Sequence, residues 1–206
     1  MAEKRNQCVN GWHRMSKTKK DIQLFGKWSF QGIEVNDLGL KKYISLRPIY
    51  LPHSMGRHEH RRFHKSEVNV VERLINNLMR PGKNAGKKTW ATGALRNALE
   101  IIHLQTGRNP IEVLVEAVQN CAASEDTTRI SYGGVVYHQA VDVSPQRRVD
   151  LALRLLAEGV RKAAFGKTRP FEECLAEELI LASENNVRAY SVSKCNEMER
   201  IARSSR

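Results

Sequence analysis

The spacing of apolar residues changes at residue 66, and this change constrains the fold more than any other feature of the chain. Before it, seven glycines and prolines interrupt the sequence between Gly11 and Gly56, so no long helix fits there. From residue 66 onward, apolar residues recur three and four positions apart, the spacing of helices with one buried face. The sequence therefore predicts a largely non-helical extension over residues 1–65 and a helical domain over residues 66–206.

Capping signals divide the helical domain into about six helices. The clearest N-terminus is Asn109-Pro110, because asparagine caps well and proline suits the first helical position. Ser144-Pro145 repeats this arrangement, and Ser66 is expected to cap the first helix. The apolar stripes end these helices near residues 79, 105, 122, 164, 183 and 202, with Trp90 on the buried stripe of the second. The expected fold is a mainly α bundle with a protruding two-stranded arm.

The arm is predicted by Gly133-Gly134, which separates two runs rich in β-branched and aromatic residues. It should form a β-hairpin over about residues 126–143. A lone hairpin is only marginally stable in water, so we expect it to be braced on the helices or held by a partner. In the extension, residues 22–30 suit a short strand, and residues 53–65 form a polar basic linker that is expected to be mobile alone and able to order on a partner.

Positive charge is concentrated in the extension. The chain of 206 residues carries a formal charge of +12, of which +9 lies in residues 1–65, +1 in 66–125 and +2 in 126–206. Two windows without any acid, residues 73–99 and 159–171, add local basic surface. This distribution indicates a polyanionic partner. Nucleic acid fits better than a membrane, because the basic region offers no long amphipathic helix and no apolar run approaches about 20 residues.

Motifs for other classes of function are missing. The N-terminus has no export signal, so we expect a cytoplasmic protein. The four cysteines lack the short spacing that a zinc site needs, and a disulfide framework is typical of small secreted chains, so buried or idle thiols are expected. No hydrolase or metalloprotease motif occurs. Gly82 to Thr89 is similar to the phosphate-binding loop of nucleotide-binding proteins, but it has one residue too few between the glycines and no predicted strand before it. We therefore predict no enzyme and no cofactor, and we expect this turn and its lysines to contact phosphate oxygens.

Two clusters of residues leave alternatives open. His53, His58, His60 and His64 crowd the linker with Glu59, and zinc is conceivable there. Neighbouring arginines would repel a cation, however, so solvated or phosphate-facing histidines are preferred. On the hairpin, aromatic and basic residues suit stacking on unpaired bases. Tyr132 and Tyr137 equally suit a cross-strand pair that stiffens the arm.

Two rival functions make different predictions. A helix-turn-helix DNA regulator needs a tight turn between two helices and a symmetric dimer, whereas the predicted loops are longer. A metal-dependent hydrolase that uses the linker histidines would purify with stoichiometric metal.

The order of these features resembles the small-subunit ribosomal protein S-seven family in its archaeal and eukaryotic form. The resemblance covers essentially the whole chain and is most specific in VERLINNLMRPGKNAGKK (71–88), EIIHLQTGRNPI (100–111) and QAVDVSPQRRV (139–149). FGKW (25–28) and YLPHS (50–54) are similar to the archaeal and eukaryotic extension, and HEHRRF (58–63) favours the archaeal side. One departure is the hairpin tip, where Ser131-Tyr132 precede the paired glycines and bacterial relatives carry an arginine.

The resemblance implies a structural component of the small ribosomal subunit. Such a protein binds the head (3′ major) domain of small-subunit rRNA, nucleates assembly of the head, and contacts neighbouring head and platform proteins. It implies that the hairpin tip, Ser131, Tyr132, Gly133, Gly134, Val135 and Val136, lies near exit-site tRNA and the mRNA path.

Charge pattern and resemblance together give the candidate RNA-binding residues. They are Arg57, Arg61, Arg62, Lys65, Arg80, Lys83, Asn84, Lys87, Lys88, Arg129, Tyr137, Gln139, Arg147, Arg148, Arg161, Lys162, Lys167 and Arg169.

Overall fold

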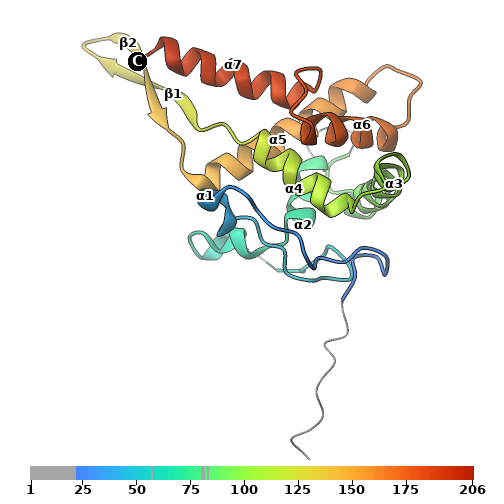
Figure 1. Cartoon of the computed structure of the whole chain (residues 1–206). Coiled ribbons are helices and arrows are strands. Elements are labelled where there is room, and N and C mark those ends of the chain that lie inside the picture. The colour runs from blue at the N-terminus through green and yellow to red at the C-terminus, as the bar shows by residue number, and fades with distance from the viewer. Residues whose placement is uncertain (1–21, 57, 80–81, 83) are drawn as a thin grey trace, which may run out of the picture.

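Helices packed around a long central helix form the body of the protein, and a β-hairpin projects from one side (Figure 1). This computed structural model describes residues 22–56, 58–79, 82 and 84–206. The helices are α1 (Leu38–Lys41), α2 (Val70–Leu78), α3 (Lys88–Thr106), α4 (Pro110–Asn120), α5 (Pro145–Ala164), α6 (Phe171–Ser183) and α7 (Tyr190–Ser204). Two single-turn 3-10 helices, η1 (His58–His60) and η2 (His64–Glu67), precede α2, and β1 (Glu125–Tyr132) and β2 (Val135–Asp142) form the hairpin. The predicted mainly α fold with a two-stranded arm is confirmed.

Capping residues set the starts of α2 and α4, and the start of α2 differs from the prediction. Asn109 caps α4 as predicted, since its side chain accepts from the Ile111 backbone N–H at 3.1 Å. The first long helix, in contrast, begins at Val70 and is capped by Asn69, not by Ser66. The Ser66 hydroxyl instead donates to the Phe63 carbonyl at 2.6 Å, because the intervening residues form the 3-10 turn η2.

The core surrounds α5, which packs against α2, α4, α6 and α7. The buried side of α3 does not include Trp90, which the sequence places on it. Trp90 is 39% exposed and lies against Phe171 at the start of α6, whereas the buried residues are Ala91, Ala94, Leu95, Ala98, Leu99 and Ile102. The indole therefore lies at the edge of the α3–α6 contact.

The described part of the extension packs into this same core. Leu24, Phe30, Val35, Leu40 and Ile44 are all buried and belong to the core cluster formed by the helices. These apolar residues occur four to six positions apart, so they cover helix faces without forming a long helix of their own. Hydrogen bonds over a long sequence separation hold the segment: the Asn109 side chain donates to the Ser29 carbonyl at 2.8 Å. The described extension is thus anchored on the helical body.

The strand expected over residues 22–30 is not formed. Leu24 donates its N–H to the Trp28 carbonyl at 2.7 Å, so the chain closes a tight turn. Phe25 and Gly26 occupy the left-handed region, with φ values of 53° and 72°, and Gly26 adopts it without steric cost. The apolar residues here therefore serve to fold the chain back onto the body.

The hairpin has the predicted turn and a regular antiparallel register. Gly133 and Gly134 both have positive φ, 58° and 84°, as a two-residue turn with the twist of the strands requires. Its base is held by the two residues after α7: the Ala140 N–H donates to the Ser205 carbonyl at 3.3 Å, and Arg206 pairs with Glu125. Ser205 and Arg206 are therefore bound to the arm. Figure 1 shows the tip projecting beyond α7.

Candidate nucleic-acid interface

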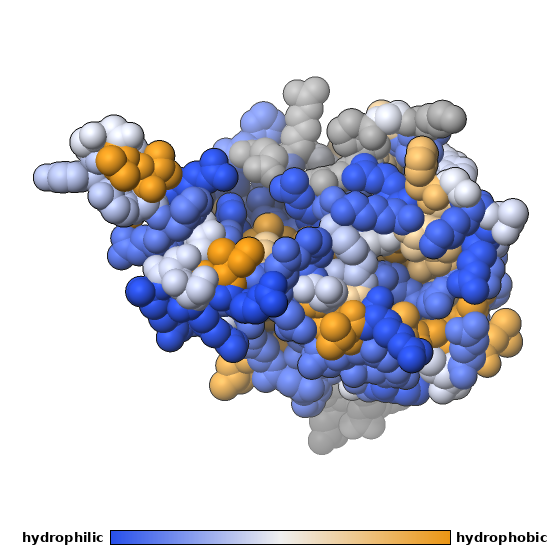
Figure 2. All heavy atoms as spheres, turned by 90° about the horizontal axis from the view of Figure 1, so that it is seen from above, coloured by the Kyte–Doolittle hydropathy of each residue, from blue (hydrophilic) through white to orange (hydrophobic). Residues whose placement is uncertain are grey.

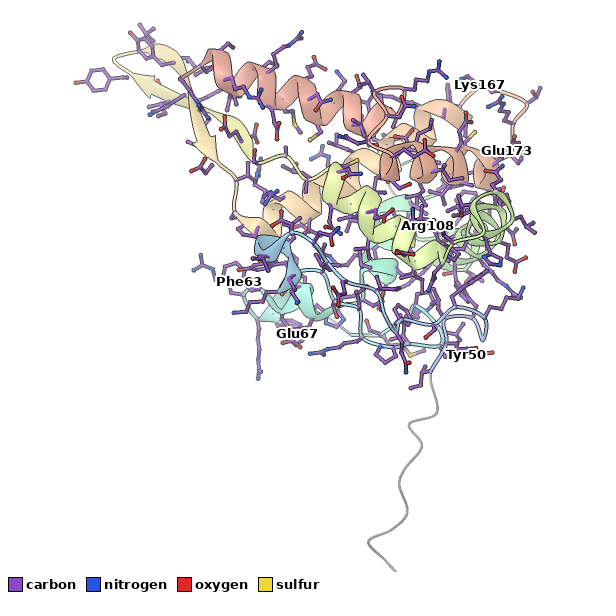
Figure 3. The ribbon with its side chains drawn as sticks, viewed as in Figure 1. Tyr50, Phe63, Glu67, Arg108, Lys167 and Glu173 are labelled. Carbon is purple, nitrogen blue, oxygen red and sulfur yellow. The ribbon has the colours of Figure 1, made fainter. Side chains whose placement is uncertain are left out.

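A basic hollow lies where the extension meets the N-terminus of α5. It has a volume of about 380 Å³ and is lined by the predicted residues Arg61, Arg62, Lys65 and Arg147, together with Phe63, Ser144, Gln146 and Asp150. The fold thus brings together cations that are about 85 positions apart in the sequence. Figure 3 labels Phe63 at this edge of the body, near the point where β2 leads into α5.

Among the described residues that line the hollow, the one carboxylate, Asp150, is neutralised by the protein itself. Asp150 lies 2.7 Å from the Lys65 ammonium and 2.6 Å from the Arg73 guanidinium. The side chain of Arg73 is only 7% exposed, so this pair also fixes α2 to α5. Arg147 contacts Asp126 at 3.1 Å but remains 62% exposed. The hollow therefore keeps a net positive charge, which suits phosphate.

Sequence reasoning missed four residues of this hollow, one of which is Asp150. Phe63 was detectable, because it is an aromatic residue within a run of basic ones, the composition of a stacking site. It has φ of 64°, and the Arg62 guanidinium lies 5.0 Å from its ring centre. Ser144 was expected to act as a helix cap only, yet its side chain makes no capping bond. Gln146 was not considered, because its burial depends on how the extension packs.

The turn before α3 divides its lysines between two roles. Lys87 is exposed at the N-terminus of α3, and Asn84 lies half-buried in the turn before it. Lys88 instead donates to Glu72 at 2.8 Å, and the Glu72 side chain is only 6% exposed. Ser54 of the extension also donates to this carboxylate, through its N–H at 3.0 Å and its hydroxyl at 3.0 Å. Lys88 thus joins three segments of the fold, and Lys87 is the lysine that faces outward.

The hairpin distributes its candidate residues over two faces. In the observed register Ile130 opposes Tyr137 and Tyr132 opposes Val135, so these four share one face, with Gln139 further along it. Arg129 opposes His138 on the other face. The two tyrosines are thus diagonal neighbours, not a directly opposed pair. Tyr132 is 82% exposed, and Figure 2 shows hydrophobic residues gathered near the end of the arm.

The remaining candidate residues differ in solvent exposure and in their pairing with other side chains. Arg148 is largely committed to the protein: it pairs with Asp37 at 3.1 Å and donates to the Ala122 carbonyl. Lys162 lies over the Tyr190 ring, and Arg169 pairs with Glu177 at 2.9 Å. Arg161 and Lys167 are exposed. Arg57, Arg80 and Lys83 lie outside the described residues.

The histidine cluster does not assemble a metal site among the described residues. His58 and His64 lie together, with ring centres 5.4 Å apart, beside a second hollow of about 320 Å³. The His58 Nε2 atom is 2.8 Å from the Ser54 hydroxyl, which in turn bonds Glu72. Within the part of the chain that the structure describes, no group of three or more potential ligands is arranged to hold a metal. No helix in that part is both long and apolar enough to cross a membrane.

Comparison with known proteins identifies relatives along most of the chain. The family described as Ribosomal protein S7p/S5e matches residues 40–206. The small ribosomal subunit protein uS7 of Cenarchaeum symbiosum (strain A) is 54% identical over 200 residues, which cover 93% of this chain and all of that one. The protein of the same name from Methanothermobacter thermautotrophicus is 50% identical over 181 residues, covering 88% of this chain and 97% of the relative. Because the family match spans most of the chain and these relatives share about half of its residues, the chain belongs to the Ribosomal protein S7p/S5e family.

Proposed function

We propose that this protein binds folded RNA of the head domain of the small ribosomal subunit through the basic hollow, the turn before α3 and the extension. As a member of a ribosomal protein family, the chain is a structural, non-enzymatic constituent of the small subunit. The finer assignment to the head domain rests on the family resemblance of residues 71–88 and 139–149. Neighbouring head and platform proteins are further proposed partners.

The convergence of cations on one hollow carries the proposal. Arg61 and Arg62 come from the extension and Arg147 from α5, and the packing of the extension onto the helices places them around one opening. Lys65 is paired with Asp150 and Arg147 contacts Asp126, but the lining keeps an excess of positive charge, and this arrangement is favourable when a polyanion occupies the hollow. Lys87 and Lys167 extend the basic surface on the helical body.

Salt dependence of binding tests the proposal. The RNA is a transcript of the head domain of small-subunit rRNA, and the variant replaces Arg61 and Arg62 by glutamine. Each lost phosphate contact should reduce the steepness of log affinity against log salt concentration by about 0.7–0.9. We therefore expect the variant to bind more weakly at low salt and to show a slope less steep by about 1.5.

A matched variant controls for net charge. Replacing Arg200 and Arg203, which lie exposed on α7, removes the same two charges far from the hollow in sequence. Its slope should change by much less than that of the Arg61 and Arg62 variant. Equal slopes for both variants would show that only net charge matters and would remove the hollow from the proposed interface.

The arm is proposed to lie near exit-site tRNA and the mRNA path. The exposed tip, with Tyr132 at 82% exposure, supports a contact with a partner beyond the protein's own body. A photo-crosslinking amino acid at position 132 should label tRNA or mRNA in subunits that carry tRNA in the exit site. Labelling of rRNA alone would contradict this placement.

A further inference from the structure

We propose that Gln146, which lines the basic hollow, reads an unpaired adenine of the bound RNA. This inference rests on the proposed function and adds to it one base-specific contact. Nothing in the sequence resemblance assigns a role to Gln146 or to Phe63; the argument comes from burial, hydrogen bonding and position.

Gln146 is a largely buried residue whose side-chain amide has no hydrogen-bond partner among the described residues. Only 7% of its surface is exposed, and it lines the hollow. Its amide atoms are not among the fully buried side-chain atoms that lack a partner in the described structure, so the exposed part of this side chain opens into the hollow. A polar group that the fold buries this far and leaves unpaired is available to complete its hydrogen bonds with a ligand.

Helix capping does not account for this glutamine. A glutamine that caps stands in the third position of a helix and reaches back to the residue before it. Gln146 stands in the second position of α5, and the helix start at Ser144 makes no side-chain capping bond. Ser144 lines the same hollow, so its hydroxyl and the first N–H groups of α5 add donors for a phosphate there.

The other lining residues fit the remaining parts of a nucleotide. Phe63 is 51% exposed at the hollow and supplies an aromatic face on which a base can stack. Arg61, Arg62 and Arg147 supply charge for the flanking phosphates. A volume of about 380 Å³ is at the lower end of the range for small-ligand sites, which runs from about 300 to 1,000 Å³. One nucleotide extruded from the RNA is therefore the occupant that the chemistry favours.

The amide selects among the bases. It presents a carbonyl acceptor beside an amino donor, and adenine presents the complementary pair, an amino group beside a ring nitrogen acceptor. Guanine offers two acceptors on the corresponding edge of the base and matches less well. A purine also offers the larger face for stacking on Phe63. These properties together point to adenine.

Replacing Gln146 by methionine separates a binding role from a structural one. Methionine keeps the unbranched shape and removes the amide. Because the amide has no protein partner, the variant should unfold at the same temperature as the wild type or higher. Its affinity for the head-domain transcript should fall about 5- to 150-fold, which is the loss expected when a base contact made through two hydrogen bonds is removed. The exposed Gln105, replaced by methionine, is the matched control and should leave affinity unchanged.

Interference mapping identifies the base. Purine riboside, which lacks the 6-amino group of adenosine, is incorporated at random into the transcript. With the wild-type protein, one unpaired adenosine should be excluded from the bound fraction. With Gln146→Met, this exclusion should disappear. The isosteric variant Gln146→Glu, whose charge is favourable in a first helical turn, provides the same test if the methionine variant does not fold.

The following outcomes would contradict the inference. Unchanged affinity for Gln146→Met, or a lower unfolding temperature with unchanged affinity, shows a structural glutamine. Retained RNA affinity with loss of a neighbouring protein from assembled subunits shows that the hollow is a protein contact. If the wild-type protein itself does not bind the transcript, the proposed function fails, a result that the wild-type titration reveals before any variant is tested.

Discussion

Replacing Lys88 by methionine should destabilise the free protein, because it leaves the buried carboxylate of Glu72 without its cation. The Glu72 side chain is 6% exposed and accepts hydrogen bonds from Lys88 at 2.8 Å and from Ser54. Removing one partner of a buried ion pair costs about 3–5 kcal/mol. The lower end applies here, since Lys88 is 21% exposed and the Ser54 donors remain. We expect a loss of about 3 kcal/mol in the free energy of unfolding, or about 6–12 °C in Tm.

The pH dependence gives a second measure of the same interaction. Burial acts to raise the pKa of Glu72, but the bonds from Lys88 and Ser54 outweigh it and hold the pKa below its usual value. A carboxyl with a lowered pKa stabilises the fold above its unfolded pKa, about 4.3, and this contribution is lost as the pH falls through the folded value. In Lys88→Met burial prevails and the pKa rises, so protonation relieves the strain. The difference between wild type and variant should therefore shrink as the pH falls from 7 toward 4.

Chemical unfolding of three variants at pH 7 checks this reasoning. Lys87→Met is the matched control, because Lys87 is the adjacent lysine and is exposed; it should change stability by less than about 0.5 kcal/mol. Replacing Glu72 and Lys88 together by methionine should recover most of the loss, since a buried pair is often replaceable by apolar residues. A Lys88→Met protein as stable as Lys87→Met would refute the assignment of Lys88 to the fold.

Three further predictions concern other parts of the molecule. Gly159→Ala should cost about 1–3 kcal/mol in thermal unfolding, because the added Cβ would lie 2.8 Å from the Glu178 carboxylate; wild-type stability would contradict that close packing. Burial raises the pKa of the Cys121 thiol to about 12 and all three described cysteines are buried, so a Cys8→Ser protein should react with Ellman's reagent at pH 8 only after unfolding. Phe63→Asn should stay within about 1 kcal/mol of wild-type stability, because asparagine tolerates the left-handed backbone, yet bind the head-domain transcript more weakly; equal affinity would exclude stacking.

Helix existence and type were predictable from the sequence, but exact starts were not. Asn109-Pro110 determines its helix by local chemistry alone, and the structure agrees. Ser66 and Asn69 are both good caps, and the choice between them depends on the 3-10 turn through which the linker reaches α2. Trp90 continues the apolar spacing of α3 in the sequence, but the packing of α3 against α6 leaves it 39% exposed at the edge of the contact, beside Phe171.

The candidate interface was predictable in composition and not in arrangement. A charge count identifies Arg61, Arg62 and Arg147, but only tertiary packing brings them to one hollow. The same count cannot separate Lys87 from Lys88, because the partner of Lys88 lies 16 residues away on another helix. The position of Gln146 in the hollow is similarly invisible in the sequence, since it results from how the extension packs against α5.

The hydrogen bonds of the extension affect the order in which this protein folds during its synthesis. The Asn36 N–H bonds Gln119, which is synthesised 83 residues later, and the bond to the Ser29 carbonyl comes from a residue 80 positions downstream. At about 5–20 residues per second, the early segment waits roughly 4–16 s for these partners. During that interval its positive charges are available while its apolar residues are uncovered. In this condition the nascent segment can bind RNA before the helical domain has been synthesised. Binding of the segment by RNA or by a chaperone therefore competes with its packing onto the helices.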